Sequence, residues 1–220
     1  MSQPIKQTFK TECFPVLLLL ITVGFSLWSY NLLPDMVATH WNIQGQVDAW
    51  GSKKFSNLFF PGLLIAIYLL FNFIPNLDPK KERYAEFANV YLMMRNAILS
   101  VFVIVFISTT LFNLGYQLNI SAIVGGAIGI LFLLIGNYFG KLKLNFFVGF
   151  RTPWTLSSEN VWNKTHRVGG KAFIILGLII AISPWLEPLA AIIAMSIGFV
   201  LMIGVGVYSY ILFRREKNIK

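Results

Sequence analysis

The side chains that could do chemistry in this 220-residue chain are few, and the two histidines come first. His40 precedes Asn42 and Asp48, but this stretch lacks the dense His and Glu spacing of known zinc motifs. His166 lies beside Glu159, on the opposite side of the membrane in the topology derived below, so the two histidines cannot share a metal. We expect a hydrogen-bonding role for His40 and no bound metal.

Other catalytic chemistries find little support in the sequence. Serine and cysteine nucleophile motifs, paired carboxylates and glycine-rich phosphate loops are absent, and a single cysteine, Cys13, allows no intramolecular disulfide. Charged residues inside apolar runs usually mark an ion pathway, yet only Arg95 enters one, near an end where it can snorkel. We therefore expect no enzyme and no cofactor, and we disfavour a channel or pump.

In this chain 56% of residues are hydrophobic and only 12% are charged, whereas soluble proteins have about 25% charged residues. Any functional residue must therefore be positioned by apolar segments. The mean hydropathy is +0.69. Continuous apolar runs predict membrane-spanning helices, whereas a membrane barrel would show short alternating strands. The sequence thus predicts an all-α integral membrane protein, a bundle of six transmembrane helices at 14–33, 57–75, 91–114, 119–139, 171–187 and 189–213.

The basic residues predict the orientation of this bundle. All of the 18 Lys and Arg residues except Lys53 and Lys54 fall on the side of the N-terminus, so both termini should be cytoplasmic. The net charge of +9 then reflects topology and contact with anionic membrane lipids, and we expect no direct nucleic-acid partner. Small residues at Gly125, Gly129, Gly136 and Gly140 predict close helix packing within the chain, with a dimer interface as the alternative.

Two segments outside the spans lie on opposite sides of the membrane. Residues 34–56, outside, alternate in polarity around a turn at 44–46, which predicts a short ribbon capping the bundle. Residues 140–170, inside, contain an apolar stretch at 146–150 that should lie at the interface or form a re-entrant turn. Ser157 or Ser158 then caps an expected short interfacial helix that runs into the fifth span.

The inner segment carries the most distinctive string in the chain. Pro153 fixes a turn, and an arginine can form forked bonds to a phosphate or carboxylate. Trp162 and His166, one helical turn apart, are expected to form an interfacial anchor with the ring stacked or bonded locally, and Trp154 with Trp162 to anchor at head-group depth. Two interpretations of this string stay open: it forms an interfacial elbow, or it forms a docking face for a cytoplasmic partner. Both interpretations concern the same residues, Arg151, Thr152, Pro153, Trp154, Trp162, His166 and Arg167.

The string at 147–156, with 161–162 and 165–167 behind it, resembles the signature of the SdpI family. The outer segments 33–34, 39–42, 45, 48 and 50–53 resemble a short N-terminal module of unknown function that often precedes that signature. This division gives an N-terminal two-helix module at 1–76, a third helix with its connections at 77–118 and an SdpI-like region at 119–220.

The resemblance implies a bacterial cell-membrane protein that protects against a secreted, membrane-active peptide. The family's namesake protects against a sporulation-delaying toxin and also signals by holding a transcriptional repressor at the membrane, so a cytoplasmic repressor is a candidate partner here. Our leading hypothesis places toxin contact on the outer segment, at His40, Trp41, Asn42, Asp48 and Trp50. The inner string would dock the regulator. The alternatives are a transporter or permease for a peptide or lipid, and a hydrolase with a metal at His40 and Asp48; the oligomeric state stays open.

Overall fold

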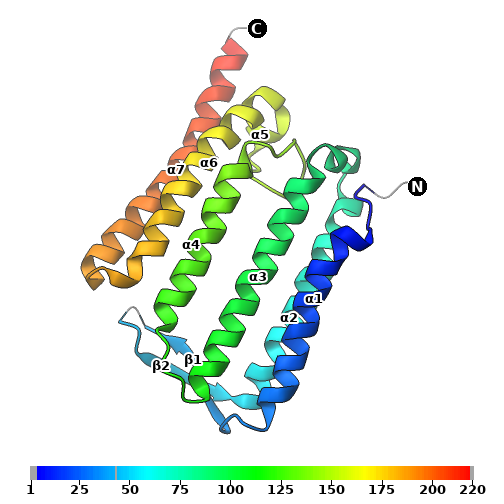
Figure 1. The fold of residues 1–220 in the computed structure, drawn as a ribbon. Coiled ribbons are helices and arrows are strands. Elements are labelled where there is room, and N and C mark those ends of the chain that lie inside the picture. The colour runs from blue at the N-terminus through cyan, green and yellow to red at the C-terminus, as the bar shows by residue number, and fades with distance from the viewer. Residues whose placement is uncertain (1–3, 43, 219–220) are drawn as a thin grey trace.

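The structure, a computed structural model, describes residues 4–42 and 44–218 and confirms a helical membrane architecture (Figure 1). In that described part, six helices are long and apolar enough to cross a membrane. Their outward faces expose many large Leu, Ile, Val and Phe side chains, as a surface in contact with lipid requires. The helices are α1 (Phe9–Tyr30), α2 (Lys53–Leu77), α3 (Ala88–Asn113), α4 (Ile120–Phe139), α6 (Glu159–Ile182) and α7 (Pro188–Asn218).

Shorter elements connect the spans at the two ends of the bundle. Strands β1 (Met36–Trp41) and β2 (Val47–Ser52) form an antiparallel hairpin at one end. Both ends of the described chain and the five-residue helix α5 (Pro153–Ser157) lie at the other end (Figure 1). Two 3-10 helices complete the chain, η1 (Lys81–Phe87) before α3 and η2 (Ser183–Trp185) before α7. We call the two ends the hairpin end and the loop end.

The six spans form two groups of three. Helices α1, α2 and α3 pack on one another, and α6 packs on both α4 and α7. The two groups meet where α3 lies beside α4, which Figure 1 shows in the centre of the bundle. Sites built from both groups must therefore lie along the α3–α4 seam.

The closest helix contact is between α4 and α6, as the spacing of small residues on the fourth span predicted. A Cβ added to Gly129 would lie 2.8 Å from the carbonyl oxygen of Gly177, and one added to Gly136 would lie 2.6 Å from that of Gly170. Backbones this close leave room for no side chain larger than hydrogen. The glycines serve packing within the chain, and α6 contributes a matching glycine row that the sequence analysis did not identify.

The ribbon at residues 34–56 was predicted correctly. Gly45 turns the hairpin with a φ of +76°, a conformation that favours glycine, and Asn42 Oδ1 accepts hydrogen bonds from the backbone N–H groups of Gln44 and Gln46. The pairing shifts register on either side of His40, as at a β-bulge. Val37 and Ala38, which precede the shifts, are both buried.

The expected interfacial helix differs in position from the prediction. The short helix before the fifth span is α5, whereas Ser158 caps α6 itself, which runs unbroken from Glu159 through the predicted amphipathic segment into the membrane. The expected interfacial anchoring of Trp162 and His166 is wrong, because both side chains are fully buried, whereas the expected local stacking of the rings is confirmed. The loop at 141–152 covers the face of α6 on which they lie.

Candidate functional site

The exposed face of the hairpin presents three of the predicted contact residues. His40 Nδ1 lies 2.5 Å from Asp48 Oδ1, and their side chains are 67% and 42% exposed. Trp50 is 60% exposed although its ring is large and apolar. An exposed tryptophan beside a polar pair suits a surface that meets amphipathic molecules at head-group depth.

The other two predicted contact residues serve the hairpin itself. Asn42 closes the turn, and its backbone N–H donates to Gln46 O at 2.8 Å. Trp41 points toward the bundle, where its ring meets Phe112 edge to face with centroids 5.2 Å apart. The Asn113 side chain, at the end of α3, fixes the hairpin by accepting from the Ala38 N–H at 2.7 Å and donating to the Ala38 carbonyl at 3.1 Å.

A cavity of about 360 Å³ lies beneath the hairpin, at the hairpin end of the α3–α4 seam. Its walls come from the hairpin and from α2, α3 and α4. Exposed residues of β1, Thr39 and His40, also line it, so it opens toward the exterior of the bundle. The volume lies within the range of small-molecule pockets, about 300 to 1,000 Å³.

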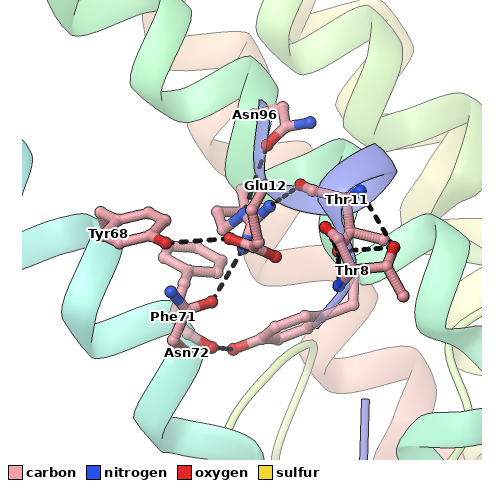
Figure 2. A network of polar contacts seen from close by, with 9 residues as sticks. Thr8, Thr11, Glu12, Tyr68, Phe71, Asn72 and Asn96 are labelled. Atoms are coloured by element: carbon pink, nitrogen blue, oxygen red, sulfur yellow. Dashed lines mark hydrogen bonds and ion pairs between the residues drawn. The ribbon is translucent and has the colours of Figure 1, made fainter. Parts of the chain in front are cut away.

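A second polar site lies near the loop end, between α1, α2 and α3. Arg95 is fully buried, and its Nη1 lies 3.0 Å from Glu12 Oε2. The same guanidinium donates to the Asn72 side chain at 2.8 Å and to the Thr11 carbonyl at 2.6 Å. Figure 2 shows this network, with Asn72 and Asn96 on either side of Glu12 and the Tyr68 hydroxyl donating to the carboxylate at 2.9 Å.

This network overturns the expectation that Arg95 snorkels to the membrane surface. The guanidinium is paired inside the bundle instead, which is how buried charges avoid the large cost of desolvation. Glu12 was not predicted to join this network, because a first span that begins at residue 14 excludes it, whereas α1 begins at Phe9. Tyr68 lies within the predicted second span, where nothing in the sequence indicated its partner. The sequence signal for this pair was one acidic residue, Glu12, at the start of the first helix and one arginine, Arg95, a turn inside the third.

Polar side chains also fold the loop at 141–152, at the loop end of the bundle. Asn145 is fully buried; its Oδ1 accepts from the N–H groups of Phe147 and Val148, and its amide donates to the carbonyl of Val148. Asp78, at the end of α2, accepts from the Phe146 N–H at 2.8 Å and from the Tyr84 hydroxyl at 3.1 Å. The loop is thus tied to the α1–α3 group as well as to α6.

The loop packs on the side chains of His166 and Trp162. Their rings stack with centroids 3.9 Å apart, and the Trp162 indole N–H donates to the Leu142 carbonyl. His166 Nε2 accepts from the Phe150 N–H at 3.1 Å, and Nδ1 lies 2.8 Å from the Trp162 carbonyl, which assigns the proton to Nδ1. Gly149, with a φ of +112°, lies against the Nε2 edge of the imidazole.

The distinctive inner string divides into supporting and exposed residues. Thr152 caps α5 in a capping box with Thr155, and the Trp154 indole donates to Ser209 on α7. Pro153 occupies the first turn of α5 and is exposed. Arg151 and Arg167 are exposed as well, with Arg151 donating to the Phe146 carbonyl at 2.9 Å.

The described residues contain no group of three His, Cys, Asp or Glu side chains that could hold a metal ion. His40 and Asp48 form a pair, and nothing in the described chain adds a third ligand to them. Two ligands fall short of the three protein ligands that a catalytic zinc site uses.

The fold, with the His40–Asp48 pair on the hairpin and the buried Arg95–Glu12 network, defines a class of protein. It is a multipass membrane protein with a structured hairpin at one end and a folded loop at the other. Residues 141–213 match the SdpI/YfhL protein family, and residues 17–65 match a domain of unknown function, DUF1648. The chain is 28% identical to Immunity protein SdpI of Bacillus subtilis (strain 168) over 173 residues, which cover 79% of this chain and 81% of that protein. No solved structure matches.

These matches confirm the resemblance to the SdpI family and agree with a multipass protein of the bacterial cell membrane. The SdpI/YfhL match includes the inner loop, α5, α6 and most of α7, whereas the second match ends within α2 and includes the hairpin. Each matched part therefore contains one of the two elements that fold outside the spans.

Proposed function

We propose that this chain is a membrane immunity protein, which gives its cell resistance to a secreted, membrane-active peptide toxin. The observation that carries the proposal is the similarity to Immunity protein SdpI over 79% of the chain. The structure agrees with a binding role, since its hairpin displays polar and aromatic side chains at one end of an otherwise apolar bundle.

The hairpin supplies the proposed contact surface for the peptide. Trp50 offers a large exposed ring, and the exposed His40–Asp48 pair offers polar groups beside it. A membrane-active peptide lies with apolar and polar faces at the same depth, so it would meet both features together. Trp41 and Asn42 keep the shape of this surface from within.

The loop end supplies a proposed docking face for a cytoplasmic regulator, such as a transcriptional repressor. Arg151 and Arg167 are exposed and can pair with carboxylates of a partner, with Pro153 between them in the chain. The buried members of the string, Trp162 and His166, would act indirectly by fixing the loop that presents those arginines.

The test is survival of a sensitive host that expresses this chain when it is challenged with sporulation-delaying peptide. Wild type should protect relative to an empty vector. Trp50→Ala should weaken protection, whereas Trp185→Ala should not, because Trp185 is an equally exposed tryptophan of η2 outside the hairpin. Sensitivity of the wild-type strain equal to that of the vector strain, at verified membrane abundance, would refute immunity to this peptide.

Docking is tested separately with Arg151→Ala. If the loop end only signals, this variant should protect as wild type does and lose the partner-dependent transcriptional response. Loss of protection at equal abundance would instead place the loop in resistance itself. An unchanged response in Arg151→Ala combined with Arg167→Ala would remove the docking face from the proposal.

A second candidate function, transport of a peptide or lipid, is favoured by one observation, the Arg95–Glu12 pair inside the bundle. Ionisable residues within membrane spans often mark ion or proton pathways. A proton-driven transporter would lose protection when a protonophore collapses the gradient, and unchanged protection would exclude that version.

A further inference from the structure

Two residues that line the cavity beneath the hairpin each carry a buried polar atom that has no partner in the described part of the chain. These atoms are the indole Nε1 of Trp41 and the hydroxyl Oγ of Ser56. A buried donor left unpaired costs about 1 to 3 kcal/mol. The indole N–H can only donate, so an occupant that satisfies it must bring a hydrogen-bond acceptor.

The cavity is lined by both apolar and polar side chains, and this limits the chemical classes of molecule that it can bind. Phe60, Val105 and Phe106 offer apolar surface, whereas Thr109 and Asn113 add polar groups on the same side of α3. A lipid acyl chain carries no hydrogen-bonding group and would leave the Trp41 indole N–H and the Ser56 hydroxyl unpaired. A peptide segment brings apolar side chains together with backbone carbonyl and N–H groups, and thus matches both kinds of wall.

We infer that the cavity receives an apolar side chain of the membrane-active peptide, and that an adjoining peptide carbonyl accepts a hydrogen bond from Trp41 Nε1. This inference deepens the proposed function and rests on it. The peptide would first meet exposed Trp50 and His40, and His40 also lines the cavity. The volume of about 360 Å³ accommodates a large side chain with its neighbouring peptide group.

The experiment measures binding of labelled sporulation-delaying peptide to the full chain in phospholipid nanodiscs. Val105→Phe adds a ring to the cavity wall and should weaken binding at least tenfold. Trp41→Phe keeps an aromatic ring against Phe112 but removes the donor, and should weaken binding about three- to tenfold, the effect of one hydrogen bond. Ile104→Phe is the matched control, because Ile104 is the neighbouring residue and is 43% exposed; its affinity should equal that of wild type.

The outcomes separate this inference from the proposed function. Wild-type binding and protection with unchanged affinity in both cavity variants would overturn the cavity site and leave immunity standing. A phospholipid that native mass spectrometry finds retained by wild type and lost from Val105→Phe, with peptide affinity unchanged, would assign the cavity to lipid and overturn the inference. Absence of both wild-type binding and protection would overturn the two proposals together. Equal melting temperatures of the variants exclude misfolding as the cause of weakened binding.

Discussion

Removing the charge of either partner in the Arg95–Glu12 pair should destabilise the α1–α3 group far more than a surface substitution does. Arg95→Met removes a fully buried guanidinium, leaves Asn72 Oδ1 and the Thr11 carbonyl without this donor, and leaves the Glu12 carboxylate with the Tyr68 hydroxyl but no opposite charge. Glu12→Gln keeps the hydrogen-bonding geometry but leaves the guanidinium as an uncompensated buried charge.

The distance between the charges sets the magnitude. At 3.0 Å and an effective dielectric constant of about 20, the attraction is about 5 kcal/mol, most of which offsets the cost of burying the charges. We expect Arg95→Met to lower the free energy of unfolding by about 3 to 5 kcal/mol and Glu12→Gln by about 2 to 4 kcal/mol. The double variant should lose at least about 2 kcal/mol less than the sum, because the second substitution removes a charge that the first left unpaired.

The assay is reversible unfolding in mixed micelles titrated with sodium dodecyl sulfate, followed by tryptophan fluorescence and circular dichroism. Arg83→Met is the matched control, since Arg83 pairs with Glu159 at 2.8 Å but that carboxylate is 51% exposed, so the loss should stay within about 1 kcal/mol. Losses from the two single variants that add to within about 0.5 kcal/mol in the double variant would refute a coupled pair.

Three further substitutions test the packing of the loop end and of the α4–α6 contact. Gly149→Ala should lower stability by at least about 2 kcal/mol, because the added Cβ has a strained positive φ and meets the His166 imidazole; Gly206→Ala, in open space on α7, should not lower the melting temperature. Gly170→Val should separate α4 from α6 and lower the melting temperature, whereas Gly206→Val should have little effect. Asp78→Ala should cost about 1 to 3 kcal/mol and speed hydrogen exchange at the Phe146 amide, and unchanged exchange there would contradict the loop anchor.

The spans and the hairpin could be predicted because their signals are local. A run of about 20 apolar residues leaves few alternatives to a membrane helix, and alternating polarity around Gly45 specifies a hairpin. The buried pair could not be predicted in this way. Whether Arg95 faces lipid or Glu12 depends on the rotation of α3 relative to α1, which composition does not encode.

The inner string shows the same limit. Its helical spacing correctly indicated that Trp162 and His166 share one face of α6. It did not indicate what covers that face, and the expectation of lipid head groups was wrong because the Asn145-folded loop lies there. The hydrogen bond from the Phe146 N–H to the Asp78 carboxylate joins segments 68 residues apart, and a contact of this kind fixes the loop without leaving a local pattern in the sequence.

Helix α3 joins the two polar sites, and this connection bears on how resistance could work. Arg95 fixes α3 to α1 and α2, Asn113 fixes its last residue to the hairpin, and the cavity lies between them beside Val105. At 1.5 Å per residue the two anchors are about 27 Å apart on one rigid helix. A protein that only neutralises a peptide needs only the Asn113 anchor, which holds the hairpin. A protein that signals also needs the position of α3 to differ between the free and the peptide-bound states. If the protein only neutralises the peptide, folded variants of Glu12 should therefore retain protection. If it signals, these variants should lose only the transcriptional response.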